Sequence, residues 1–169
     1  AFTTILFNIS IAGINSIMKT IFICEYVTGG GYINKKISKK LFVQANIILK
    51  SLLNDFNKIP NLKIIYTWDY RYKEITKRKR TQCVFIKKNP WKIWSHLIKK
   101  SDFFFPIAPE SNGDLLKIVK FGNSQKKNLI GSNIVAIKIA SSKYKTYKLF
   151  KKYSIPTIPT FKNIKKINY

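Results

Sequence analysis

Carboxylates, glycines and one arginine follow three apolar runs of this sequence, at positions where their side chains could line a ligand pocket. These residues are Glu25, Gly29, Gly30, Gly31, Asp69, Arg71 and Glu110. If the apolar runs are parallel strands, the residues after them lie at one edge of a sheet. Open α/β sheets bind their ligands at that edge, outside the carboxyl ends of the strands. This placement would allow the edge to bind a small molecule.

The stretch 19–33 (KTIFICEYVTGGGYI) passes from an apolar, β-branched run through Glu25 into the glycine triplet, and a helical pattern follows. The order strand, glycine turn, helix is typical of the start of a parallel α/β domain. Glycines tolerate positive φ and let a ligand approach the backbone closely. A plain flexible turn explains the triplet equally well. The spacing is not the G-x-G-x-x-G of a dinucleotide site.

The remaining candidates each allow two interpretations. Glu110 lies between the apolar run 102–109, which predicts a buried central strand, and a following helix. It either lines the ligand edge or is stabilised by the dipole of that helix, and the residues alone favour the dipole interpretation. Asp69 and Arg71 are two residues apart in a predicted loop after the second strand. They are weaker candidates for the same edge, or a surface ion pair that contributes little to stability.

The spacing of apolar residues predicts the elements that must position these side chains. Strands are expected at 21–24, 62–67, 83–86 and 102–109. Helices are expected at 38–56 with Ser38 as N-cap, after Asn89-Pro90, from 115, at 133–140 with Ser132 as cap, and at 142–153. The first helix carries one apolar stripe, formed by Leu41, Ala45, Ile48, Leu52 and Phe56. This order predicts a three-layer α/β domain with a mainly parallel sheet, followed by a helical linker.

Aromatic and histidine side chains near residue 95 are interpreted as structural. Trp91, Trp94 and Ile98 have helical spacing, which is typical of core packing. His96 has no acid or nucleophile partner in the pattern. The two cysteines, Cys24 and Cys83, lie in apolar runs, where free buried thiols are common. No metal-ligand spacing is present, and a reduced cytoplasmic setting is the simplest interpretation.

The net charge of +25 comes almost entirely from lysine, since only three of the 32 basic residues are arginine. The chain is also rich in Ile, Asn, Tyr and Phe, which share A/T-rich codons with lysine, so genome composition can account for this profile. Proteins that read phosphates or bases usually rely on arginine. Non-specific binding to polyanions is permitted by the charge. A nucleic-acid-binding function is the alternative, and solvated lysine faces are favoured.

Residues 1–17 carry no charge and are largely apolar, but polar residues interrupt them. They lack the basic start and cleavage site of a signal peptide. Met18 is the only methionine and directly precedes the first strand. We therefore expect an N-terminal extension of uncertain status at 1–17, with Met18 as the native start. A membrane anchor is the less favoured interpretation.

Two groups of motifs resemble the ATP-grasp ligase superfamily. The segment 132–160, SNIVAIKIASSKYKTYKLFKKYSIPTIPT, is similar to the linker that enters the nucleotide domain of these enzymes. The motifs EYVTGGG, TWDYR and IAPESNG are similar to a subgroup that includes tyramine–glutamate ligases. The resemblance implies a Rossmann-like pre-ATP-grasp domain at 18–131. The linker and the incomplete start of the ATP-grasp domain would occupy 132–169.

The resemblance implies ATP-dependent ligation of a carboxylate to an amine through an acyl phosphate, with Mg²⁺. Lys143 matches the lysine that contacts the ATP phosphates, although the family usually has Asp where this chain has Ser142. Glu25, the glycine triplet and Glu110 match positions in loops on the substrate side, with Asp69 and Arg71 as weaker candidates. The second ATP lysine and the metal carboxylates of the family fall beyond the last residue here. The fragment itself is thus expected to be inactive and truncated before the ATP-grasp domain. A non-catalytic α/β remnant is a further alternative.

Overall fold

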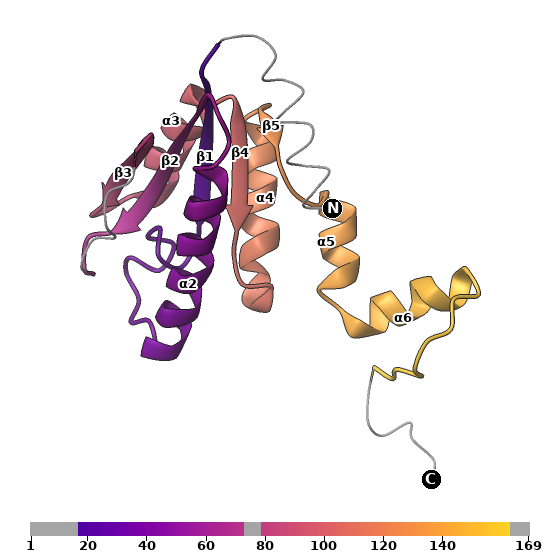
Figure 1. The fold of residues 1–169 in the computed structure, drawn as a ribbon. Coiled ribbons are helices and arrows are strands. Elements are labelled where there is room, and N and C mark those ends of the chain that lie inside the picture. Colours follow the sequence, from indigo (N-terminus) through magenta and orange to yellow (C-terminus); the bar gives the residue numbers. More distant parts are fainter. Residues whose placement is uncertain (1–16, 73–78, 163–169) are drawn as a thin grey trace.

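A computed structural model describes residues 17–72 and 79–162 of the chain (Figure 1). The predicted extension at 1–17 therefore lies almost entirely outside the described residues. The same holds for most of the charge run 73–80. Within the described ranges, every helix is too short or too polar to cross a lipid bilayer.

The five strands of the described sheet are parallel. The sequence predicted a mainly parallel sheet of four strands, and the fifth, β5, was not predicted. Their order across the sheet is β3-β2-β1-β4-β5. The strands are β1 (Lys19–Glu25), β2 (Leu62–Asp69), β3 (Thr81–Ile86), β4 (Phe103–Ile107) and the short β5 (Asn128–Leu129). The central strand is β1, so the expectation that the run 102–109 forms the central strand is wrong. β4 alternates between buried and half-buried residues, because one of its neighbours is only two residues long.

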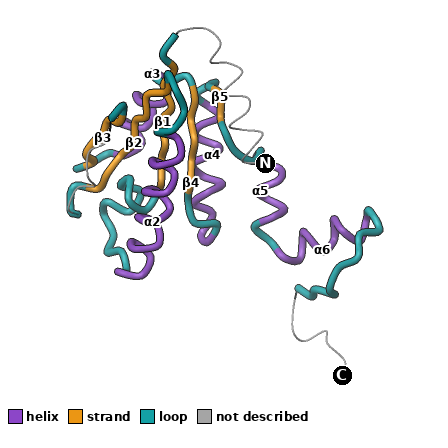
Figure 2. Tube along the Cα trace, viewed as in Figure 1, coloured by secondary structure: helices purple, strands orange, loops and turns teal. Residues whose placement is uncertain are grey.

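Helices cover both faces of the sheet, which gives the predicted three layers (Figures 1 and 2). One face packs against α2 (Lys39–Phe56), through a cluster that includes Ile21, Leu49 and Trp68. The other face packs against α3 (Pro90–Lys100) and α4 (Asp114–Ser124), through a cluster that includes Phe22 and Trp94. Alternate residues of β1 thus enter opposite cores, as expected for a strand buried on both faces.

The helix starts follow from their capping residues. The Ser38 hydroxyl accepts a hydrogen bond from the Leu41 amide at 3.2 Å, as predicted. Pro90 occupies the first turn of α3, where its missing N–H costs nothing. The cap of α5 (Ile134–Ala140) is Asn133, whose side chain accepts from the Ala136 amide at 2.8 Å. The expectation of Ser132 as this cap is therefore wrong by one residue.

The buried stripe of α2 also differs from the prediction. Its buried residues are Ala45, Leu49, Leu53 and Phe56, whereas Ile48 is 45% exposed. Both stripes have helical spacing, and only the angle at which the helix meets the sheet selects between them.

A helical arm follows the sheet, as expected for the linker. α5 packs against α4, and α6 (Lys143–Lys152) packs against α5. No residue of α6 is buried. Figure 1 shows this arm projecting away from the layered domain, with α6 farthest from the sheet.

Candidate functional site

The predicted site residues on β1, β2 and β4 lie at one edge of the sheet, where parallel strands end together. Glu25, the last residue of β1, is in register with Ile107, the last residue of β4. The chain continues this contact past the strands, since the Tyr26 amide donates to the Ile107 carbonyl at 2.7 Å. On the other side, the Asp69 amide donates to the Thr28 carbonyl at 2.6 Å. The loops after β1, β2 and β4 are therefore direct neighbours.

Glu25 stabilises its own loop. Its carboxylate is buried, with 3% of the residue exposed. The Thr28 amide and hydroxyl each donate to one carboxylate oxygen at 2.6 Å, and the Val27 amide donates to the other at 3.3 Å. Burial raises the pKa of Glu25 above its ordinary value of 4.5, although these hydrogen bonds oppose the shift. This carboxylate holds the turn in shape and has few sites left for a ligand.

The raised pKa of Glu25 makes a prediction about pH. Because the folded state favours the protonated carboxyl, the contribution of Glu25 to stability is complete below the unfolded pKa and is lost as pH rises through the folded pKa. Glutamine at this position does not titrate. The free energy of unfolding of the wild type minus that of Glu25→Gln should therefore decrease as pH rises above 4.5, the ordinary pKa of a glutamate side chain. Urea titrations at several pH values measure this difference, and a difference that increases with pH would contradict the assignment.

The glycine triplet is required by packing. A Cβ on Gly29 would lie 2.5 Å from the Glu25 carbonyl oxygen and 2.6 Å from Thr67 Oγ1. Gly30 has φ of 94°, and a Cβ there would lie 2.7 Å from the Ile86 side chain. Gly31 is closed in by the Tyr26 ring. The interpretation as a plain flexible turn does not describe this loop, because its backbone is fitted closely to β2 and β3.

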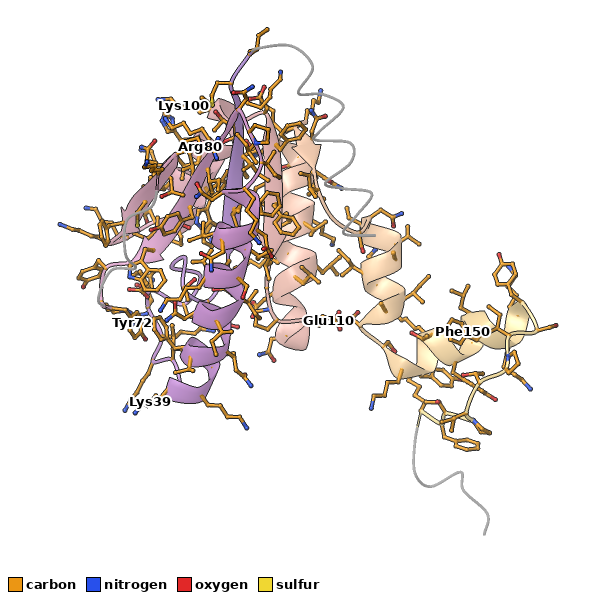
Figure 3. All side chains as sticks on the ribbon, in the orientation of Figure 1. Lys39, Tyr72, Arg80, Lys100, Glu110 and Phe150 are labelled. Atoms are coloured by element: carbon orange, nitrogen blue, oxygen red, sulfur yellow. The ribbon has the colours of Figure 1, made fainter. Side chains whose placement is uncertain are left out.

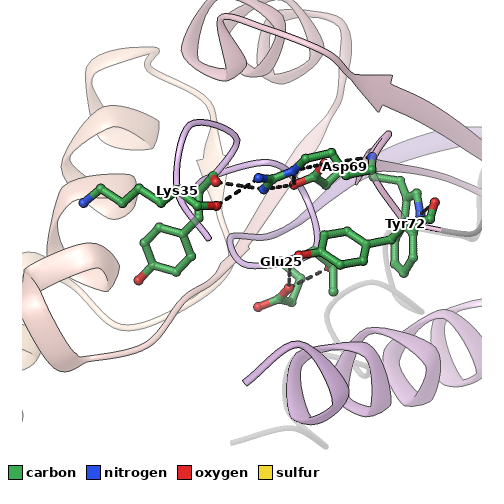
Figure 4. A network of polar contacts seen from close by, with 8 residues as sticks. Glu25, Lys35, Asp69 and Tyr72 are labelled. Atoms are coloured by element: carbon green, nitrogen blue, oxygen red, sulfur yellow. Dashed lines mark hydrogen bonds and ion pairs between the residues drawn. The ribbon is translucent and has the colours of Figure 1, made fainter. Parts of the chain in front are cut away.

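Asp69 and Arg71 link the end of β2 to the loop 26–35, which contains the glycine triplet and is called the glycine loop below (Figure 4). Asp69 is completely buried and is the last residue of β2, not a loop residue. Arg71 Nε donates to Asp69 Oδ1 at 3.0 Å, and Nη2 donates to Oδ2 at 2.6 Å. The same guanidinium donates to the Lys35 and Tyr32 carbonyls at 2.9 Å each. The interpretation as a weak surface pair is wrong, because one partner is fully buried and the geometry is a fork.

Tyr32 and Asp114 connect the glycine loop to the start of α4, and neither was among the residues predicted for the site. The Tyr32 hydroxyl donates to Asp114 Oδ2, and the carboxylate is largely buried. Burial, together with this hydrogen bond and the charge of Asp114, raises the pKa of Tyr32. The only local signals were a tyrosine directly after the glycines and an acid in a first helical turn, and neither indicates the other.

Glu110 lines a groove between the domain and the arm. The groove has a volume of about 290 Å³ and is bounded by the end of β4, by α4 and by α5. Its walls are mostly apolar, with Leu115, Val119 and Ile137 among them, and Ser132 adds a hydroxyl. Glu110 is exposed, and Figure 3 places it between the lower end of α4 and the arm. Among the described residues, no side-chain hydrogen bond or ion pair engages its carboxylate.

Lys143 is the first residue of α6 and is exposed. Ser142 is the N-cap of this helix, and its hydroxyl accepts from the Lys145 amide at 3.4 Å. Serine caps a helix as well as aspartate does, so Ser142 meets the local requirement at the start of α6. Lys143 does not line the groove that contains Glu110. The structure thus brings together the loops after β1, β2 and β4, and it places Lys143 separately on the arm.

The carboxylates of this edge do not fit a magnesium ion. Glu25, Asp69 and Asp114 are engaged in the internal hydrogen bonds described above, and Glu110 lines a groove that none of these three lines. Within residues 17–72 and 79–162, no group of three His, Cys, Asp or Glu side chains could hold a metal ion.

Comparison with known proteins gives two matches. Residues 62–137 match the family model of the pre ATP-grasp 3 domain, a range that contains Asp69, Arg71 and Glu110 and ends before Lys143. The fold resembles a crystal structure from Archaeoglobus fulgidus, described as an ATP-grasp superfamily protein, with a TM-score of 0.63 and 21% identity. That alignment covers 79% of this chain and 40% of the other, so this chain spans less than half the length of that protein. Among curated proteins, none matches the sequence.

Proposed function

We propose that this chain is the amino-terminal part of an ATP-grasp ligase that joins a carboxylate to an amine through an acyl phosphate formed with ATP. The match of residues 62–137 to a pre-ATP-grasp domain supports this proposal, and so does the shared fold. Because the described residues do not fit Mg²⁺, we assign no catalytic step to them. In the proposal, the metal carboxylates and the second ATP lysine belong to a further part of the protein, and the 169-residue chain alone is inactive.

The exposed carboxylate of Glu110, which lines the groove, is the observation that supports a substrate role for this edge. The other three carboxylates here are held by donors of the protein itself. Glu110 alone presents its oxygens to a groove of about 290 Å³, in a chain with a net charge of +25. A single exposed carboxylate above apolar walls suits an ammonium group on a partly apolar body. We therefore assign the amine substrate to this groove, with the tyramine-type subgroup as the finer proposal.

The remaining residues have supporting roles in this proposal. Lys143 binds an ATP phosphate, because a free lysine and the unpaired amides of the first turn of α6 both attract anions. The glycine loop, Glu25, Asp69 and Arg71 act as positioning residues. Their hydrogen bonds fix the loops beside the groove, so that the edge is preorganised before substrates bind.

Two variants with opposite expected effects on KM test the proposal in the full-length product of the natural gene. ATP turnover is followed as ADP release with a panel of amines that includes tyramine, and with glutamate among the carboxylates. Glu110→Gln should raise KM for the amine about tenfold and leave KM for ATP within about twofold, since it removes one charge-assisted contact. Lys143→Gln should raise KM for ATP about tenfold and leave KM for the amine within about twofold. Lys36→Gln, an exposed lysine of the loop before α2, serves as the control.

Two outcomes would overturn parts of this assignment. If the full-length protein releases no ADP with any amine and carboxylate pair, ligation is the wrong function. If Glu110→Gln raises both KM values equally, the groove does not hold the amine.

A further inference from the structure

Charge is divided between the two ends of the sheet. The end opposite Glu110, where the strands begin, carries cations before or within the first residues of every strand. These are Lys19, Lys63, Lys79, Arg80, Lys99, Lys100, Lys126 and Lys127. Figure 3 places Arg80 and Lys100 together at this end, far from Glu110. Glu25, Asp69 and Asp114 lie at the carboxyl edge, and Asp102 at the amino edge pairs with only one of these cations, Lys19, so the amino edge remains positive.

A cavity of about 410 Å³ opens at this basic edge, between the sheet and α3. Its polar lining consists of Thr20, Lys63, Gln82, His96 and Lys100. The fold places them there, because Thr20 is in register with Lys63 and Gln82 with Ile65, so these residues share the face that α3 covers. His96 and Lys100 are four residues apart on α3 and therefore project from one side of the helix.

The cavity has no negative charge of its own. No acidic residue lines it. In the described part of the chain, ion pairs engage Lys19, Lys58 and Arg71, and none engages Lys63 or Lys100. Asp102 accepts from the amide of Thr20, a lining residue, at 2.8 Å and pairs with Lys19 at 3.4 Å. The ion pair with Lys19 offsets part of its charge.

We propose that this cavity is a second ligand site, which binds a compact phosphate-bearing small molecule. Two ammonium groups supply charge, and lysine is a common phosphate ligand. The Gln82 amide, the His96 ring and the Thr20 hydroxyl supply further donors. Ile65 and Val84 form an apolar floor on which a non-polar part of the ligand can lie. The volume lies within the range of small-molecule pockets, and the site is independent of the groove at Glu110.

Titration calorimetry of the 169-residue chain with inorganic pyrophosphate tests this site. Lys63→Gln/Lys100→Gln should weaken binding about tenfold or more, since two charge-assisted contacts are lost. Lys39→Gln/Lys40→Gln removes the same charge from α2 on the opposite face of the sheet. This control should change the affinity by less than about twofold. Gln82→Ala, which leaves the net charge unchanged, should still weaken binding severalfold.

Three other outcomes would overturn the proposal. Equal weakening by both double variants, with Gln82→Ala unaffected, would overturn the proposal and assign pyrophosphate binding to the overall charge. A single-stranded oligonucleotide that binds far more tightly than pyrophosphate, and that loses affinity equally in both double variants, would show a nucleic-acid surface instead. Absence of pyrophosphate binding to the wild type would also overturn the proposal.

Discussion

Replacing Arg71 with methionine should lower the free energy of unfolding by about 3–5 kcal/mol, since it leaves a buried carboxylate without its partner. Asp69 is completely buried, and its side chain pairs with the guanidinium through both oxygens. The same change removes the two hydrogen bonds to the Lys35 and Tyr32 carbonyls. The loss is large because native domains are stable by only about 5–15 kcal/mol in total. Urea unfolding followed by circular dichroism measures it.

Two further variants separate the causes of this loss. Arg71→Lys keeps a positive charge near Asp69 but cannot form the fork, so the loss should be intermediate, about 1–3 kcal/mol. Lys87→Met removes an exposed charge after β3 and should change stability by less than about 0.5 kcal/mol. If Arg71→Met lowers the free energy of unfolding by less than about 1 kcal/mol, the contacts of Arg71 do not hold the glycine loop to β2.

Replacing Gly29 with alanine should cost about 3 kcal/mol or more, at the upper end of the range for overpacking. The added Cβ would lie 2.5 Å from the Glu25 carbonyl oxygen, which is backbone and cannot rotate away. That carbonyl accepts a hydrogen bond from the Gly29 amide at 2.8 Å. Relief of the contact therefore breaks the turn and moves Glu25, which Thr28 holds. Thermal and urea unfolding of the variant measure the cost.

Gly113→Ala is the matched control for this prediction. Gly113 has φ of 72°, but a Cβ there would meet nothing within 4 Å. Its replacement should cost only the strain of the left-handed conformation, about 1–2 kcal/mol. If both variants lose the same stability, close packing is not the reason for glycine at position 29. A larger loss for Gly29→Ala supports a rigid loop beside the candidate site.

The contrast between Glu110 and the other acids bears on how this edge could function. The carboxylates of Glu25, Asp69 and Asp114 hold the loops together through short hydrogen bonds. Glu110 faces the groove between the domain and the arm. Fixed loops around one free carboxylate are the arrangement expected for a preorganised substrate site. Substitutions at the first three positions should therefore affect stability first.

The sequence by itself determined the kinds of element and their parallel arrangement. Apolar runs such as Ile21–Cys24 and the cap at Ser38 are local signals, because strand and helix periodicity and capping depend on neighbouring residues. The alternation of strands and helices then required parallel strands. Parallel strands place their following loops at one edge, which is why Glu25 and Glu110 could be assigned to the same side of the sheet.

Only the tertiary structure decided what each of these residues does there. Arg71 binds carbonyls 36 and 39 residues away, and Tyr32 binds Asp114 across 82 residues. The glycines are explained by Thr67, Ile86 and Tyr26, which approach their backbone in space. The rotation of α2 left Ile48 exposed. These contacts depend on strand register and helix orientation, which are set by the packing of the whole core and leave no local pattern in the chain.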